Sequence, residues 1–221
     1  MDSQKFRIRH CTPLDEKAVY EVCLRTGDSG QNATHLYSDP LALGHIYVGP
    51  YLKLEPELAF ALEDDLSVCG YVFGALNSRK FYDGYLTQWL PEIRRTHPEP
   101  KGNPTTWSPT EKIYYEYHRP EIHYPASFED FPSHLHIDLL PRAQGLGFGT
   151  RMIATLVAEL EKRGSPGVHL ALSSANRRAE RFYRRLGYVE LARVGNRDPQ
   201  TVFMGKRLEP ADDLDKAAVF R

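Results

Sequence analysis

The sequence lacks any long apolar run, and it contains few cysteines. No stretch of its 221 residues approaches the roughly 20 apolar residues of a membrane-spanning helix, and its beginning has no apolar signal region. The three cysteines, Cys11, Cys23 and Cys69, are widely spaced and odd in number, so they form neither a metal-binding knuckle nor a disulfide framework. We therefore expect a soluble protein without a membrane partner in a reducing compartment, the cytoplasm, with the nucleus as the alternative.

The sequence also lacks an excess of charge of either sign. Its 28 basic and 29 acidic residues leave a net charge of −1, and no basic stripe stands out. A nucleic-acid-binding domain needs such a stripe to neutralise phosphates, so we expect no nucleic-acid partner. The length suits one domain with an insertion, and we expect residues 1–221 to form a single domain.

Hydrophobic periodicity predicts strands that alternate with helices. The strand-like segments are 6–10, 59–63, 68–76, 134–140, 168–173, 188–194 and 201–208. The helix-like segments, with apolar residues at three- and four-residue spacing, are 15–24, 81–90, 110–119, 148–163 and 176–186. Near residues 39–52 we expect a short helix and a turn around Gly44 and Gly49. This order predicts a mixed α/β sheet with helices on both faces.

Residues 78–132 interrupt this alternation as an insertion. The segment is rich in tyrosine and histidine, and prolines punctuate it. We predict that its first helix ends near Pro91, because proline lacks the N–H that a helix interior uses. The aromatic side chains either pack the insertion against the body or cover a cleft as a substrate lid, since the insertion directly precedes the central strand.

A strand, a glycine loop and a helix form the centre of the chain. The strand His134–Leu140 stops at Pro141, and the loop Gln144–Gly149 leads into an amphipathic helix. The first N–H groups of a helix have no partners within it, and the helix dipole places partial positive charge there. Glycines allow the backbone to approach a phosphate closely. The pattern therefore predicts an anion site.

The spacing of the glycines resembles one family's phosphate loop. The loop contains neither Gly-x-Gly-x-x-Gly nor Gly-Lys-Ser/Thr, the dinucleotide and P-loop patterns. Instead, Gln144-x-x-Gly147-x-Gly149 is similar to the pyrophosphate loop of the GNAT superfamily of acyl-CoA N-acyltransferases. Farther along, Asn176 and the run FYRRLGY (182–188) resemble the second GNAT signature. Two signatures in the right order are much more specific than either alone.

A narrower resemblance spans nearly the whole chain. Residues 19–30, 39–52, 60–76 and 132–141 are similar to the acetyltransferase-like domain at the C-terminus of O-GlcNAcase and to its stand-alone microbial relatives. The resemblance implies a GNAT fold, with a mixed and mostly antiparallel central sheet flanked by helices on both faces. It implies acetyl-CoA as the cosubstrate and no metal. The chain is too short to carry the glycoside hydrolase, so only the properties of this domain are implied.

The resemblance also implies which residues contact the acyl-CoA. The set is Leu139, Leu140, Gln144, Gly145, Leu146, Gly147, Phe148, Gly149, Thr150, Asn176 and Tyr183. Backbone N–H groups near Leu139 and Leu140 would meet the thioester oxygen, and Tyr183 would give a proton to the leaving thiolate. Asn176 would contact the pantetheine arm or orient its own helix as an N-cap.

Acyl transfer to an amine requires a base, and the central strand offers three candidates. His134, His136 and Asp138 alternate, so their side chains share one face of the strand. A carboxylate in mid-strand needs a partner, so Asp138 is the first candidate, with His136 and His134 behind it. The alternative for the histidines is a hydrogen-bonded place in the core. Asp28 and Tyr117 are further candidates for contact with the substrate.

The sequence therefore predicts an acetyl-CoA-dependent N-acetyltransferase in which a primary amine attacks the thioester directly in a ternary complex. A protein, an amino sugar or a polyamine would each supply such an amine. Two alternatives stay open: a non-catalytic module that binds acyl-CoA or a protein, and a metallohydrolase with His134, His136 and Asp138 as ligands. The metallohydrolase motif breaks at Leu139, where a further ligand is expected.

Overall fold

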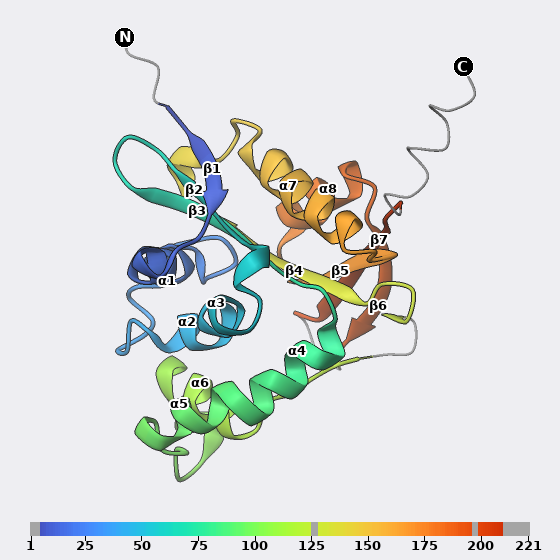
Figure 1. Ribbon diagram of the computed structural model, residues 1–221. Helices are drawn as coiled ribbons and strands as arrows, with labels where there is room; N and C mark the ends of the chain where they lie inside the picture. The colour runs from blue at the N-terminus through green and yellow to red at the C-terminus, as the bar shows by residue number, and fades with distance from the viewer. Residues whose placement is uncertain (1–4, 125–127, 196–198, 210–221) are drawn as a thin grey trace, which may run out of the picture.

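One sheet of seven strands organises the protein, and helices cover both of its faces (Figure 1). The structure is a computed structural model that describes residues 5–124, 128–195 and 199–209. The predicted insertion is thus described except for residues 125–127. None of the helices in the described ranges is both long enough and apolar enough to span a membrane.

The strands agree with the predicted segments, with ends that differ by one residue at most. Every neighbouring pair is antiparallel except β4 and β5, which are parallel. The spatial order is β1-β2-β3-β4-β5-β7-β6, which confirms the predicted mixed and mostly antiparallel sheet. The strands are β1 (Arg7–His10), β2 (Ala59–Glu63), β3 (Val68–Ala75), β4 (Ser133–Leu139), β5 (Gly167–Ser173), β6 (Val189–Val194) and β7 (Thr201–Arg207).

Eight α-helices in the described ranges surround the sheet. They are α1 (Glu16–Thr26), α2 (Ala42–Tyr47), α3 (Gly49–Leu54), α4 (Ser78–Gly84), α5 (Leu90–Thr96), α6 (Pro109–His118), α7 (Phe148–Lys162) and α8 (Arg177–Arg185). In Figure 1, α7 and α8 lie on one side of β4, and α1, α2 and α3 lie on the other. The helices of the insertion, α4 to α6, lie beyond α2 and α3.

Alternating side chains along β3 give the sheet its two apolar faces. Gly74 lies against Leu156 of α7, where a Cβ would come within 2.7 Å of the leucine side chain. On the opposite face, the ring of Phe73 stacks on Tyr51 of α3 with 5.7 Å between the ring centroids. Gly74 and the side chains that it and Phe73 contact are all buried, as is Phe73 itself. The core therefore has two layers, with the sheet between them.

The strands β4 and β5 are paired only at their beginnings. Ser133 pairs with Val168 and His134 pairs with His169, after which the two strands separate. Each strand stays in register with its other neighbour: β4 pairs with β3 as far as Leu139, and β5 pairs with β7 as far as Ser173. The sheet consequently opens between β4 and β5, at the edge where the glycine loop follows β4.

The expected turn is present, but it lies at Val48 between α2 and α3, whereas Gly44 lies within α2 and Gly49 begins α3. A Cβ on Gly44 would overlap the ring of Tyr20, and a Cβ on Gly49 would overlap Trp89 and the Tyr20 hydroxyl. These glycines therefore allow close helix packing rather than a change of chain direction.

The first helix of the insertion also does not end near Pro91. The chain stays helical from Ser78 to Thr96, because a π-helical segment, Tyr85–Trp89, joins α4 to α5. The N–H of Leu90 donates to the carbonyl of Tyr85 five residues earlier. This wider turn accommodates the proline ring at the second position of α5.

We predict that Gly44→Ala destabilises the protein by about 1–3 kcal/mol, because the new methyl group overlaps the Tyr20 ring in a packed core. Urea denaturation measures the difference. Gly84→Ala is the matched control, since the nearest atoms to its Cβ would be the flexible methyl groups of Leu54, at 3.2 Å. Equal stabilities for the Gly44→Ala variant and the native protein would contradict this packing.

Candidate active site

The glycine loop forms one wall of a cavity of about 620 Å³. Gly145 and Gly147 have φ angles of 76° and 81°, which residues with a Cβ rarely adopt. Gly147 is the N-cap of α7. Among the described hydrogen bonds, the amides of Phe148, Gly149 and Thr150 have no backbone acceptor. The loop and the start of α7 therefore present free N–H groups and the positive end of the helix dipole.

Two contacts hold this loop against β4 and α8. The side-chain Nε2 of Gln144 donates to the carbonyl oxygen of Leu139 at 2.7 Å, so the loop closes back onto the end of the strand. Gly149 faces Phe182 of α8, and a Cβ there would lie 3.2 Å from the phenylalanine ring. The glycine thus allows α8 to approach the loop and complete the cavity.

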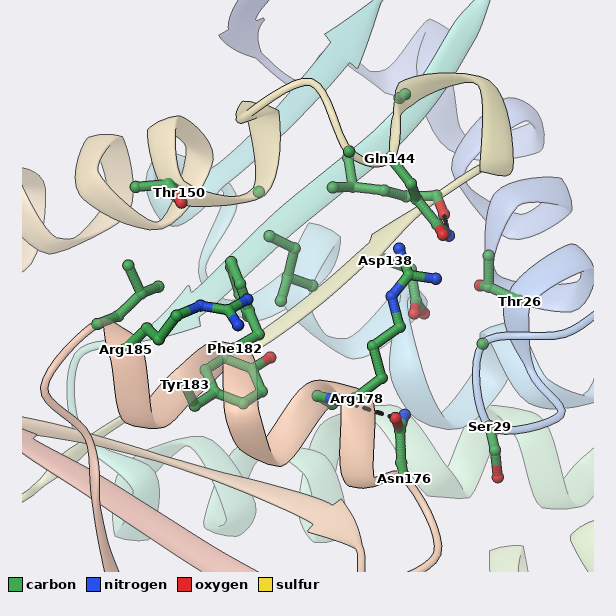
Figure 2. A pocket seen from close by; sticks show the side chains of 18 of the residues that line it. Thr26, Ser29, Asp138, Gln144, Thr150, Asn176, Arg178, Phe182, Tyr183 and Arg185 are labelled. Carbon is green, nitrogen blue, oxygen red and sulfur yellow. Dashed lines mark hydrogen bonds between the residues drawn. The ribbon is translucent and has the colours of Figure 1, made fainter.

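Two arginines that the sequence analysis missed also line the cavity. Arg178 and Arg185 of α8 are exposed, and neither has an ion-pair partner among the described residues. By contrast, Arg177 and Arg184 pair with Glu180 at 3.1 and 2.9 Å. Figure 2 shows the Arg178 side chain extending across the cavity toward Gln144 and Asp138. The cluster of arginines in 177–185 was the available signal, but only the fold shows which of them face the loop.

One of the two predicted oxyanion donors is already occupied. The N–H of Leu140 donates to the carbonyl of Cys69 at 2.8 Å, so it points toward β3. In an antiparallel pair, the N–H groups of successive residues point to opposite sides of the strand. The N–H of Leu139 therefore points into the opening between β4 and β5. The prediction is corrected to Leu139 alone.

Asp138 and His136 share a hydrogen-bonded group with Tyr71 of β3. The Tyr71 hydroxyl donates to Oδ2 of Asp138 at 2.6 Å and lies 3.0 Å from Nε2 of His136. Oδ2 of Asp138 and Nε2 of His136 are 3.4 Å apart. Because Tyr71 is fully buried, it holds the carboxylate of Asp138 in one orientation at the wall of the cavity. Sequence reasoning missed Tyr71, whose role depends on the β3–β4 register.

His134 occupies a different environment, although it shares the predicted face. It is 4% exposed, and its two ring nitrogens contact the hydroxyls of Ser78 at 2.7 Å and Tyr51 at 2.9 Å. Burial lowers the pKa of this histidine well below its ordinary value. With both nitrogens occupied, His134 belongs to the core alternative rather than to a base or to a metal-ligand set with His136 and Asp138.

Tyr183 lines the same cavity as Asp138, from α8 (Figure 2). Burial raises the pKa of Tyr183, and the neighbouring Tyr188 and the charge of Asp138 add to the effect. The hydroxyl therefore stays protonated at neutral pH, which is the form that donates a proton. Asn176 also lines the cavity, and its side chain accepts a hydrogen bond from the N–H of Ala179, so it caps α8.

The opening between β4 and β5 connects this cavity to a second one. A smaller cavity of about 350 Å³ lies in the opening and shares Ile137, Asp138 and Tyr183 with the first. It also shares Leu135 and His136 with a third cavity of about 510 Å³. The third cavity is lined by the insertion, with Tyr82, Tyr85, Tyr115, Glu116 and His123 among its residues. The insertion thus forms a wall of this third cavity, which we call the far cavity.

Several predicted contacts lie elsewhere. Tyr117 is fully buried in the core and donates to the carbonyl of Ala42 at 2.8 Å, so its neighbours Tyr115 and Glu116 line the far cavity instead. Asp28 is exposed and lines none of the described cavities, although Ser29 and Gly30 beside it line the first one. Leu146 points to solvent, and the Phe148 side chain packs against Phe6.

The chain belongs to the acetyltransferase (GNAT) family, whose model matches residues 32–188. The glycine loop, the strands β2 to β5 and the opening between β4 and β5 all lie within this match. The match confirms the resemblance drawn from the two sequence signatures and supports acyl transfer to an amine as the general activity of the cavity.

Particular relatives refine this assignment. The Protein O-GlcNAcases of Rattus norvegicus and Mus musculus are each 28% identical to the chain over 207 residues, 93% of this chain but 22% of theirs. The chain therefore spans about a fifth of the length of these relatives. The crystal structure of SsHAT has a TM-score of 0.84 at 38% identity and covers 92% of this chain and 98% of its own.

A more distant structure shares the fold alone. Naa20 of Chaetomium thermophilum, solved in complex with a bisubstrate analogue, has a TM-score of 0.54 at 19% identity, with 94% of this chain and 89% of that chain covered.

We predict that ionisation of Glu116, which lines the far cavity, lowers the free energy of unfolding as the pH rises. Burial, with Glu121 nearby, raises the pKa of Glu116 from 4.5 to about 6. Because the pKa in the folded state lies above 4.5, the contribution of Glu116 to the stability is greatest below pH 4.5. It is lost as the pH rises through about 6. Between pH 4 and 7, Glu116→Gln should therefore gain up to about 2 kcal/mol of stability relative to the native protein.

Denaturation with urea at several pH values tests this difference, with Glu129→Gln as the control, since Glu129 is an exposed glutamate of the same insertion. Parallel stability curves for Glu116→Gln and the native protein would mean that Glu116 ionises normally in the folded state.

Proposed function

We propose that the protein is an acetyl-CoA-dependent N-acetyltransferase in which a primary amine attacks the thioester directly in a ternary complex. The observation that carries this proposal is the opening between β4 and β5, which joins the cavity at the glycine loop to the cavity lined by the insertion. Acyl-CoA would enter from the side of the loop, and the amine would enter from the side of the insertion.

The glycine-loop side suits a ligand with phosphates and a long arm. The free amides at the start of α7 would bind the pyrophosphate, and Arg178 and Arg185 would neutralise its charge. The unpaired backbone of β4 and β5 offers N–H and C=O groups to the amides of the pantetheine arm. No such arrangement is needed to bind a bare anion.

Three groups would carry out the reaction: the carboxylate of Asp138, the hydroxyl of Tyr183 and the N–H of Leu139. Asp138 accepts a proton from the amine, whose ordinary pKa of about 10.4 leaves it protonated at neutral pH. The amine nitrogen forms a bond to the acetyl carbon, and the N–H of Leu139 stabilises the charge on the carbonyl oxygen. As the bond between carbon and sulfur breaks, Tyr183 donates its proton to the sulfur, and the nitrogen releases its second proton, which restores the Tyr183 hydroxyl as the amide forms.

The alternatives are less consistent with the geometry. A non-catalytic module has no need for Asp138 and Tyr183 to line one cavity, yet they do. A metallohydrolase would require lone pairs on His134, both of whose nitrogens are occupied. The acceptor is an amine on a protein, an amino sugar or a polyamine, and we propose that the protein acts in the cytoplasm or the nucleus.

Cofactor binding should depend on the two unpaired arginines. Arg178→Ala and Arg185→Ala are each expected to weaken acetyl-CoA binding by about tenfold or more, because each removes a charge-assisted hydrogen bond of at least about 1.5 kcal/mol. Isothermal titration calorimetry measures the affinity. Arg181→Ala is the matched control, since Arg181 is exposed on the same helix and does not line the cavity. Equal losses in all three variants would indicate a general charge effect.

Turnover should depend on Asp138 and Tyr183 more than binding does. Asp138→Asn and Tyr183→Phe are expected to lower kcat by about 10²–10⁴-fold while acetyl-CoA affinity changes little, because each removes a proton transfer. Release of free CoA with a panel of primary amines reports turnover. Tyr124→Phe is the control, since Tyr124 lines none of the described cavities. Tight acetyl-CoA binding without turnover on any amine would favour the non-catalytic module.

A further inference from the structure

Three potential metal ligands meet outside the acyl-transfer cavities. A carboxylate oxygen of Asp39 and one ring nitrogen each of His45 and His97 lie within 4.8 Å of one another. Asp39 precedes α2, His45 lies in α2, and His97 directly follows α5. The cluster therefore joins the body of the domain to the insertion.

The surrounding hydrogen bonds fix one nitrogen of each histidine as a donor. The Tyr117 hydroxyl donates to the carbonyl of Ala42, so toward Nδ1 of His45, 3.1 Å away, it acts as an acceptor. Nδ1 of His97 lies 2.9 Å from the carbonyl oxygen of Ile93, which can only accept. Both rings therefore carry their proton on Nδ1 and leave the lone pair of Nε2 free.

This is the arrangement that metal-binding histidines adopt. A ligating histidine usually donates its other N–H to a backbone carbonyl or another oxygen, which fixes the ring and makes the ligating nitrogen more basic. The third group is held in the same way. Tyr114 donates to Oδ2 of Asp39 at 2.9 Å, and the N–H of Leu41 donates to Oδ1 at 2.9 Å.

The burial of the cluster suits an ion that enters from solvent. His45 is buried, whereas the side chains of His97 and Asp39 are 18% and 19% exposed. Nε2 of His97 lies 3.6 Å from Oδ2 of Asp39, close to the separation of about 3.3 Å between two ligands of a tetrahedral ion. Since all the separations lie within 4.8 Å, no pair has to close by more than about 1.5 Å.

We propose that Asp39, His45 and His97 bind one divalent transition-metal ion, Zn²⁺, with water in the fourth position. Two neutral imidazoles and one carboxylate suit Zn²⁺ better than Mg²⁺ or Ca²⁺, which prefer oxygen ligands. The ion is structural: it fastens the end of α5 to α2 and so fixes the insertion.

An ion bound by Asp39, His45 and His97 would also hold together two regions that line the far cavity. The same two regions line it: α2 contributes Tyr47, and the insertion contributes Tyr85 and Glu116. The ring of His97 also contacts Tyr114 and Tyr117 of α6, with centroids 5.0 and 5.6 Å apart. An ion at this position therefore ties α2, α5 and α6 together behind the wall of the cavity.

The test is a titration of the full-length protein, stripped with a chelator, with Co²⁺ as a spectroscopic probe and Zn²⁺ as competitor. We expect one equivalent of Co²⁺ with the visible absorption of a tetrahedral nitrogen and oxygen site, displaced by Zn²⁺. His97→Gln and Asp39→Asn should weaken binding by more than about 100-fold, because losses of second-shell partners alone cost 10–100-fold. Both positions are partly exposed, so these variants avoid replacing the buried His45.

His123→Gln is the matched control, since it removes an exposed histidine of the same insertion. It should keep the native Co²⁺ affinity, and Zn²⁺ should raise its thermal midpoint as it does for the native protein. Zn²⁺ should leave the midpoint of His97→Gln unchanged. The proposal is wrong if the native protein binds no equivalent of Co²⁺, or if His97→Gln binds it as tightly as His123→Gln does.

Discussion

The separation of β4 from β5 is the constraint on which the rest of the site depends. Each strand keeps its full pairing with its outer neighbour, so neither can bend toward the other to close the opening. The last paired residues are fixed from several sides. Ser133 donates to the carbonyl of Leu76 and contacts the Ser165 hydroxyl, both at 2.7 Å, and His134 is held by Ser78 and Tyr51. The opening is therefore a rigid feature of the sheet.

This fixed strand pairing explains why the groups proposed for the reaction come from separate elements and still meet. β4 supplies Asp138 and the N–H of Leu139, α8 supplies Tyr183, and the loop before α7 supplies the anion site. Tyr71 acts from β3 by orienting Asp138. A group supplied by a packed strand or helix keeps its position without a ligand, which limits the entropy that has to be lost when acyl-CoA and the amine bind.

Local patterns predicted the scaffold of the site but not its contacts. The glycine spacing, the helix periodicity and the cap at Asn176 each lie within a few residues of sequence, and the structure contains all three. Tyr71, the direction of the Leu140 N–H and the core position of His134 depend on strand register and on partners far along the chain. The same holds for Asp39, His45 and His97, whose spacing matches no short metal motif. At Gly44, sequence alone could not distinguish a turn from close packing.

In the proposed mechanism, acyl-CoA would enter through the glycine-loop cavity and the amine through the cavity lined by the insertion, so the two ligands would have separate entrances. Under that proposal neither ligand would have to leave for the other to exchange, so spent CoA would be replaced while a large acceptor stays in place. Several amines on one acceptor could then be modified in a single encounter. In this proposal the topology of the sheet, and not only the chemistry of its residues, would determine whether one bound acceptor is acetylated once or several times.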